Sequence, residues 1–156
     1  MSILTALALI VFIIEAQIPS LTIPGIKLGL ANIITLIALV FLGRKQAGMI
    51  LAVRIILGSI FVGSVGTIVF SGTGGVLCYI VMSLTVYRFP PQQLWVVSVL
   101  GAIAHNTGQL LAAALVMRTL AVFAYTPVLL ISAVISGGFT GLCAVYICKY
   151  QKWIKK

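Results

Sequence analysis

The amino-acid sequence predicts an all-α integral membrane protein, a six-helix bundle with both termini in the cytoplasm. Hydrophobic residues make up 62% of the 156-residue chain and charged residues only 7%, whereas soluble domains carry about 25% charged residues. Apolar segments recur along the whole length, and at about 20 residues per span roughly six helices fit. The net charge of +9 gathers at segment ends rather than along an exposed face, which argues against binding to nucleic acid.

The predicted helices are separated by recognisable breaks. Pro19 and Pro24 interrupt the chain after the first helix, Arg44 lies in a tight charged turn, and Arg88 precedes the paired prolines that stop the fourth helix. The segment Gly63–Gly75 is rich in glycine, serine and threonine and is predicted to be a loop. Within one transmembrane domain of residues 1–156, the predicted helices cover residues 2–18, 28–42, 47–62, 75–87, 94–117 and 127–150.

The charges of the loops give the predicted orientation. In a six-helix arrangement, seven basic residues fall on one side and only Lys27 and Arg118 fall on the other. Because loops rich in Lys and Arg stay in the cytoplasm, both termini are predicted to be cytoplasmic. Two termini on the same side of the membrane require an even number of spans, which agrees with six helices. The seven residues are Arg44, Lys45, Arg88, Lys149, Lys152, Lys155 and Lys156.

Glu15 is the only acidic residue in the chain, and it follows a long apolar run. An ionisable group at membrane depth is costly, so it is a hypothesis for a functional site. In the predicted topology Glu15, Lys27 and Asn32 lie toward the outer leaflet, where they could share one outward-facing pocket. Alternatively, Glu15 pairs with Lys27 or Arg54 and only fixes helix packing. Arg54 needs a partner at its depth, and Glu15, backbone carbonyls or a lipid phosphate are the options.

The fifth predicted helix carries the strongest local signal, the cluster of His105, Asn106 and Gln109. These hydrogen-bonding side chains lie within about one helical turn of each other. Near the middle of a membrane they must point into protein or into a wet cavity. They are therefore either contacts between helices or ligand-binding residues. Small residues nearby, such as Gly101 and Gly108, allow a neighbouring helix to approach closely.

The composition excludes several kinds of chemistry. With no Asp and one Glu, the chain cannot supply paired-carboxylate catalysis or aspartate-rich magnesium sites. It has no GxxxxGK[ST] motif, so any ATP hydrolysis must come from partner proteins. Cys78, Cys143 and Cys148 lie in apolar runs without metal-ligand spacing and are predicted to be packing residues. We predict no catalytic residue, no metal site and no cofactor.

Three stretches, Glu15–Pro19, Pro24–Asn32 and Gly101–Gln109, resemble the Gx transporter family, whose members are often labelled heptaprenyl diphosphate synthase component I. The resemblance covers nearly the whole chain. The family is similar to the substrate-binding S components of energy-coupling factor (ECF) vitamin transporters, which are six-helix proteins with an outward-facing pocket. It implies a multi-pass protein of the bacterial plasma membrane. S components usually carry an Ala-xxx-Ala pattern for docking to a coupling subunit, and only Ser2 and Ala6 have that spacing on the first helix here.

Three functions follow from these observations, and the first is favoured. It is an S component of an ECF-type importer, which captures a small vitamin-like, flavin-related or isoprenoid-related ligand while the first loop and Gly63–Gly75 close over it. The second is a non-catalytic membrane subunit that assists polyprenyl diphosphate synthesis, and the third is a partner in a quinone or flavin extracellular electron transfer assembly. For the first, the predicted partners are an ECF coupling subunit, ATPase subunits, the ligand and membrane lipids. Its predicted substrate-binding residues are Glu15, Lys27, Asn32, His105, Asn106 and Gln109.

Overall fold

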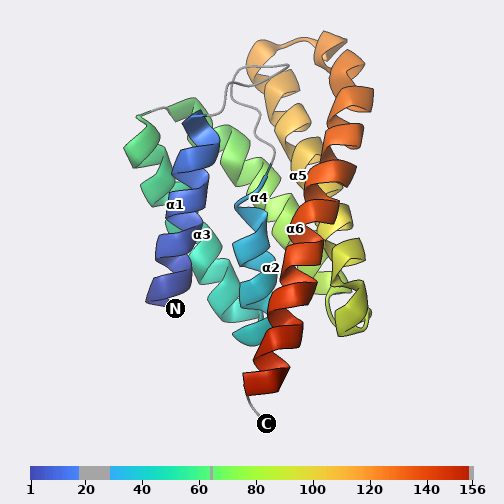
Figure 1. The fold of residues 1–156 in the computed structure, drawn as a ribbon. Coiled ribbons are helices and arrows are strands. Elements are labelled where there is room, and N and C mark those ends of the chain that lie inside the picture. Colours follow the sequence, from blue (N-terminus) through green and yellow to red (C-terminus); the bar gives the residue numbers. More distant parts are fainter. Residues whose placement is uncertain (18–28, 64, 155–156) are drawn as a thin grey trace.

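The chain forms a bundle of helices in a computed structural model that describes residues 1–17, 29–63 and 65–154 (Figure 1). The described residues contain six α-helices, two short 3₁₀ helices and no strand, as the sequence predicts. The α-helices are α1 (Ser2–Gln17), α2 (Asn32–Phe41), α3 (Arg44–Val62), α4 (Val65–Thr85), α5 (Leu94–Met117) and α6 (Thr126–Ile154). The 3₁₀ helices are η1 (Pro91–Gln93) and η2 (Leu120–Tyr125).

The helices differ in how much of a membrane they can cross. Among the described residues, four segments are long and apolar enough for a full span: Arg44–Val62, Ile68–Thr85, Pro91–Met117 and Leu120–Tyr150. The helix α1 has 16 residues and α2 has 10. At 1.5 Å per residue they reach about 24 Å and 15 Å, against a hydrocarbon core of about 30 Å. The sequence thus predicts the number of helices, but two of the six are short.

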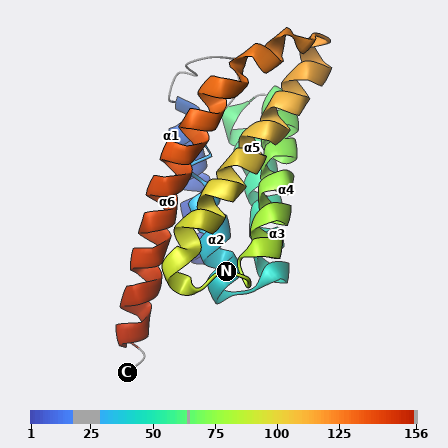
Figure 2. The same cartoon turned by 90° about the vertical axis from the view of Figure 1, so that its right-hand side faces the viewer.

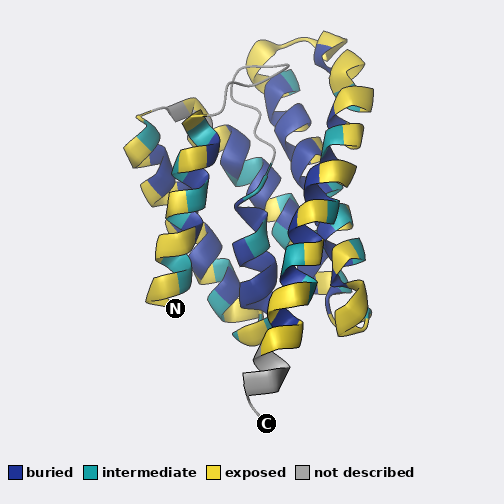
Figure 3. Ribbon diagram, in the orientation of Figure 1, coloured by how far each residue is buried: buried dark blue, intermediate teal, exposed yellow. Residues whose placement is uncertain are grey.

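The outer surface of the bundle has the character expected of a membrane protein. Large apolar side chains are widely exposed, and Ile3 and Leu115 each keep 77% of their surface accessible. In Figure 3 the exposed residues follow the outer faces of the helices, while the buried residues face inward. A soluble monomer rarely exposes so much contiguous apolar surface. The described helices therefore turn their apolar faces outward toward lipid as well as inward toward the core.

The fourth helix corrects the prediction that Gly63–Gly75 is a loop. The helix α4 begins at Val65, about ten residues earlier than expected, and includes most of this glycine-rich segment. In hydrocarbon an unpaired backbone group is costly, so a stretch rich in glycine stays helical there. Its glycines serve packing, because a Cβ atom on Gly74 would lie only 2.9 Å from Cγ of Gln109 on α5. The prediction that Gly63–Gly75 is a loop that closes over a ligand is therefore wrong.

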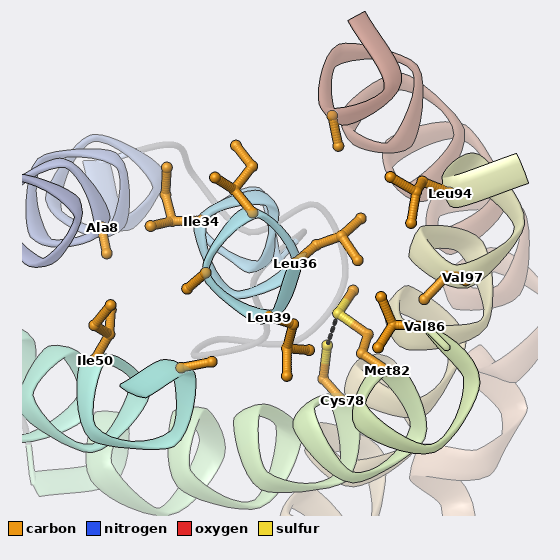
Figure 4. Close-up of a cluster of buried hydrophobic side chains, with 14 of the residues drawn as sticks. Ala8, Ile34, Leu36, Leu39, Ile50, Cys78, Met82, Val86, Leu94 and Val97 are labelled. Carbon is orange, nitrogen blue, oxygen red and sulfur yellow. Dashed lines mark hydrogen bonds between the residues drawn. The ribbon is translucent and has the colours of Figure 1, made fainter. Parts of the chain in front are cut away.

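The short helix α2 lies at the centre of the bundle. Seven of its ten residues are buried, and Leu36, Ala38 and Leu39 have no exposed surface. Figure 4 shows the side chains of α2 pointing outward from its axis in several directions, toward Ala8 of α1 and toward Cys78 and Met82 of α4. An element that is apolar all round belongs in the interior. The other helices therefore surround α2 and separate it from lipid.

The helix α5 packs between α4 and α6 through small residues (Figure 2). A Cβ atom on Gly108 would lie 2.8 Å from Cα of Gly74, and one on Gly137 would lie 2.8 Å from a Cα atom of α5. The hydroxyl groups of Ser98 and Thr140 are 2.9 Å apart across the second of these contacts. The close approach predicted from the spacing of small residues is confirmed. This close packing holds α5, and with it the cluster of His105, Asn106 and Gln109, between the long helices α4 and α6.

Candidate functional site

Glu15 lies in the last turn of α1, away from the end of the bundle that carries the N-terminus (Figure 1). Its side chain is only 4% exposed. The carboxylate accepts hydrogen bonds from the backbone N–H groups of Gly29 and Ala31, the latter at 3.4 Å. These N–H groups precede α2, whose N-cap residue Ala31 supplies no side-chain cap. Glu15 therefore fixes the turn that leads into α2, and its negative charge is favourable near the positive end of the α2 dipole.

Arg54 projects from α3 into the same region and is bonded to Asn32 at the start of α2. Both terminal nitrogens, Nη1 and Nη2, donate to Oδ1 of Asn32 at 3.4 Å. Arg54 is 2% exposed, so it does not reach lipid phosphate by snorkelling as one of the sequence-based options supposed. The contact to Asn32 was not among those options. Two helices are thus held together by a charge-assisted hydrogen bond in a dry environment.

Gly29 lets the backbone come close to His105 of α5. Its φ angle is +79°, a left-handed conformation that glycine adopts without strain. A Cβ atom here would lie 2.7 Å from Nδ2 of Asn32 and 3.0 Å from Cδ2 of His105. On the other side of the imidazole, a Cβ atom on Gly74 would lie 3.0 Å from Cε1 of His105. Because Gly29 and Gly74 have no side chains, there is space beside them for the imidazole of His105.

These groups surround one small polar cavity. Its volume is about 10 Å³, which is room for roughly one water molecule. In the described part of the chain, no three His, Cys, Asp or Glu side chains are grouped so that they could hold a metal ion. The charged groups at its border are the carboxylate of Glu15 and the guanidinium of Arg54. The lining residues are Phe12, Glu15, Gly29, Ala31, Asn32, Arg54, Ser71 and His105.

The structure brings together half of the predicted binding residues. Glu15, Asn32 and His105 line the cavity. Asn106 faces another way, because its Nδ2 donates to the backbone carbonyl of Leu129 on α6 at 2.8 Å. Gln109 is fully buried and packs against α4 rather than lining the cavity. The sixth predicted residue, Lys27, lies outside the described residues, and so does most of the predicted first loop.

Two lining residues were missed or undervalued by the sequence reasoning. Ser71 went unnoticed because its segment was taken for a loop, although a helix at this point would have turned a hydroxyl inward. Arg54 was assigned mainly a structural role, yet its guanidinium borders the cavity together with the carboxylate of Glu15. The signal that could have found it is its charge: it is a basic residue within an apolar helix, away from both ends.

A protein-family model matches nearly the whole chain. Residues 4–147 match the family described as heptaprenyl diphosphate synthase component I. The matched range contains all the residues that line the cavity. Comparison with curated proteins and with solved structures gives no match.

Proposed function

We propose that this chain, which belongs to the heptaprenyl diphosphate synthase component I family, is the substrate-binding S component of an ECF-type importer. In this role it is a multi-pass protein of a bacterial plasma membrane with both termini in the cytoplasm. It captures a small vitamin-like, flavin-related or isoprenoid-related molecule from outside. A coupling subunit and ATPase subunits then drive the transport step, because the chain has no nucleotide-binding motif of its own.

The observation that carries this proposal is the convergence of polar groups from five helices on one place inside an apolar bundle. Glu15, Arg54 and His105 come from α1, α3 and α5, and each is at most 4% exposed. Burying charges requires their removal from water, and well-packed apolar residues often stabilise a fold equally well. Intramembrane ionisable residues are typically retained for binding or transport. A ligand site explains why three such groups occur together.

The position of the cavity agrees with capture from outside. The helix α1 runs from the N-terminal end of the bundle to the opposite end, and Glu15 lies in its last turn (Figure 1). With the N-terminus in the cytoplasm, Glu15 lies toward the outer leaflet, while Arg54 and His105 come from the middle of α3 and α5. In the orientation proposed from the loop charges, the side of the cavity that carries Glu15 therefore faces outward.

Binding requires the site to open, since the present cavity holds about one water molecule. The helix α1 is the element best placed to move. Among the helices that the structure describes, it packs only against α3 and α2, at the edge of the bundle, whereas α5 is enclosed by α4 and α6. Outward movement of α1 breaks the hydrogen bonds from Glu15 to Gly29 and Ala31 and exposes the start of α2.

The direct test is ligand binding by the purified protein in detergent or nanodiscs. A panel of vitamins, flavins and isoprenoid compounds is titrated while the intrinsic tryptophan fluorescence is followed, together with the thermal unfolding midpoint. We expect saturable binding of at least one compound, and loss of that binding in Arg54→Gln. Gly138→Ala serves as the matched control, because a Cβ atom there meets nothing within 4 Å. Folded protein that binds none of these compounds contradicts the proposal.

A second candidate function, assistance to polyprenyl diphosphate synthesis, is favoured by an apolar groove on the outside of α3 and α4. The groove has a volume of about 530 Å³. Arg44 lies at one end, where its carbonyl accepts a hydrogen bond from the hydroxyl of Tyr79 at 2.9 Å. The guanidinium of Arg44 itself lies 5.0 Å from the ring centroid of Tyr87, so what the groove offers is apolar surface that suits a long isoprenoid chain. The groove is lined by Gly48, Leu51, Ala52, Ile55, Ile56, Gly72, Val76, Tyr79 and Ile80.

This second function is tested by measuring prenyl transfer by the partner synthase in vesicles with and without this protein. If the groove presents the lipid substrate, Gly72→Phe fills it and lowers the rate or shortens the product. Gly138→Phe adds the same ring on α6, outside the groove, and serves as control. An unchanged rate and chain length on adding the wild-type protein dismisses the role.

A further inference from the structure

We infer that the ligand of the cavity at the start of α2 is a small organic anion whose carboxylate or phosphate oxygens replace the carboxylate of Glu15. This inference rests on the proposed binding function and names the chemical class of its ligand. It is carried by the hydrogen-bonding groups that line the cavity. Glu15 is the only acid in the chain, so it is the only resident anion that this site can have.

The cavity has more hydrogen-bond donors than acceptors. Arg54 has five N–H groups and no acceptor. Its Nε, buried with the rest of the side chain, has no hydrogen-bond partner among the described residues. Nδ2 of Asn32 is likewise buried and lacks an acceptor within that part of the chain. Two donors at the border of one cavity therefore lack an acceptor within residues 1–17, 29–63 and 65–154. A buried donor without a partner costs about 1–3 kcal/mol, more when it is charged.

The amide of Asn32 cannot be turned to remove this imbalance. Oxygen and nitrogen of an amide are assigned from their hydrogen-bond partners. Because the guanidinium of Arg54 only donates, the amide must present its oxygen to both Nη atoms, as it does at 3.4 Å. The amide nitrogen then necessarily faces away from Arg54. The missing component is an acceptor, and a carboxylate or phosphate offers several.

The backbone at the start of α2 is already arranged around an anion. The N–H groups of Gly29 and Ala31 donate to the carboxylate of Glu15. Backbone N–H groups and the helix dipole together make such a helix start favourable for negative charge. The first N–H groups of α2 bond to backbone carbonyls of the preceding turn, as that of Asn32 does to Gly29, so the N–H groups of the turn itself remain for an anion. Glu15 therefore occupies the place that the acidic group of a ligand would take.

The size of the cavity requires replacement rather than addition. A space of about 10 Å³ cannot hold a ligand beside the Glu15 side chain. When Glu15 withdraws with α1, its own volume becomes free and the positive charge of Arg54 loses its nearby counter-charge. Leaving such a charge buried and uncompensated is strongly unfavourable. An incoming anion restores the compensation, which makes ligand capture and withdrawal of Glu15 one coupled event.

Matched pairs of probes test this inference in the purified protein. Sodium benzoate and inorganic phosphate are compared with benzamide at constant ionic strength, with the thermal unfolding midpoint as readout. We expect saturable shifts with the anions and none with the amide. In Glu15→Gln we expect benzoate to bind about tenfold more tightly, because a neutral amide competes for N–H groups less strongly than a carboxylate does. Arg54→Gln should lose the response, while Gly138→Ala should keep it.

The outcomes separate the inference from the proposed function. Equal binding of benzamide and benzoate overturns the anion assignment, and so does weaker benzoate binding in Glu15→Gln, because Glu15 would then contact the ligand directly. In either case, saturable binding of a ligand leaves the proposed transport function standing. If Glu15→Gln does not fold, the comparison of benzoate with benzamide on the wild-type protein tests the anionic class of the ligand by itself. If the protein does not respond to the anions but binds a neutral vitamin, only the inference of an anionic ligand is rejected, and the proposed transport function stands.

Discussion

Oδ1 of Asn32 lies 3.4 Å from both terminal nitrogens of Arg54, and this contact joins the start of the central helix α2 to α3. Asn32 is 4% exposed and Arg54 is 2% exposed, so both partners are shielded from bulk water. The amide is the acceptor that the structure gives to the guanidinium, while Glu15 is engaged by backbone N–H groups. How well the buried positive charge of Arg54 is tolerated therefore depends on its contact with Asn32.

We predict that Asn32→Ala lowers the free energy of unfolding by about 2–4 kcal/mol, because it leaves a buried charge without its acceptor. Asn32→Asp is the control, since it keeps an acceptor at nearly the same place. The measurement is the unfolding midpoint in a mild detergent, by heat or by titration with a denaturing detergent. An alanine variant as stable as the wild type would show that Arg54 is satisfied by other groups.

The backbone contact between α4 and α5 gives a second prediction. A Cβ atom on Gly108 would lie 2.7 Å from the carbonyl oxygen of Thr73 and 2.8 Å from Cα of Gly74, and neither backbone atom can rotate away. We expect Gly108→Ala to destabilise the protein by about 1–3 kcal/mol through overpacking. Gly138→Ala on α6 meets open space and should be neutral or stabilising, because alanine favours helix by up to about 1 kcal/mol. Equal midpoints for the two variants would contradict the contact.

Asn106 is predicted to matter for stability and not for ligand binding. Its amide donates to the carbonyl of Leu129 at 2.8 Å and so links α5 to α6, away from the cavity. Asn106→Leu removes this link at similar volume and should reduce the free energy of unfolding by about 1 kcal/mol. The dissociation constant of any ligand that depends on Arg54 should stay within experimental error. A large loss of affinity would place Asn106 in the binding site after all.

The orientation proposed from the loop charges is tested by labelling single cysteines in whole cells. The variants start from a background without Cys78, Cys143 and Cys148, none of which forms a disulfide in the structure. Leu120→Cys in η2, where the side chain is 78% exposed, should react with a membrane-impermeant maleimide from outside. Gln92→Cys in η1 should react only after the cells are opened. The reversed pattern would put both termini outside and Glu15 toward the inner leaflet.

Hydropathy and charge predicted the class of fold because they report directly on the solvent around each helix. They did not predict the start of α4, since a run of glycine, serine and threonine between Gly63 and Gly75 has the composition of a loop in water. In hydrocarbon the same run packs as helix: Gly74 and Gly75 lie against the side chains of Gln109 and Leu51. The environment of the chain, which the residues alone do not state, decided between the two structures.

The site was predictable in part for a similar reason. Scarcity of charge identifies Glu15, and Asn32 and His105 also line the cavity. The direction in which each member of the cluster on α5 points depends on the neighbours of that helix. His105 meets Gly29 while Asn106, one residue later, meets Leu129 on α6. Positions along one helix separate by about 100° per residue, so adjacent polar residues in a sequence can serve different purposes.

The shortness and enclosure of α2 have a consequence for how the protein is made. A helix of ten residues at the centre of the bundle is too brief to be released into the bilayer as an independent unit. It leaves the ribosome before α4, α5 and α6, which form much of its surroundings. The nascent chain must therefore hold this segment at the insertion machinery, or shelter it beside α1, until the later helices arrive. Biogenesis of the protein should accordingly depend on membrane insertases more strongly than that of a bundle built from full-length spans.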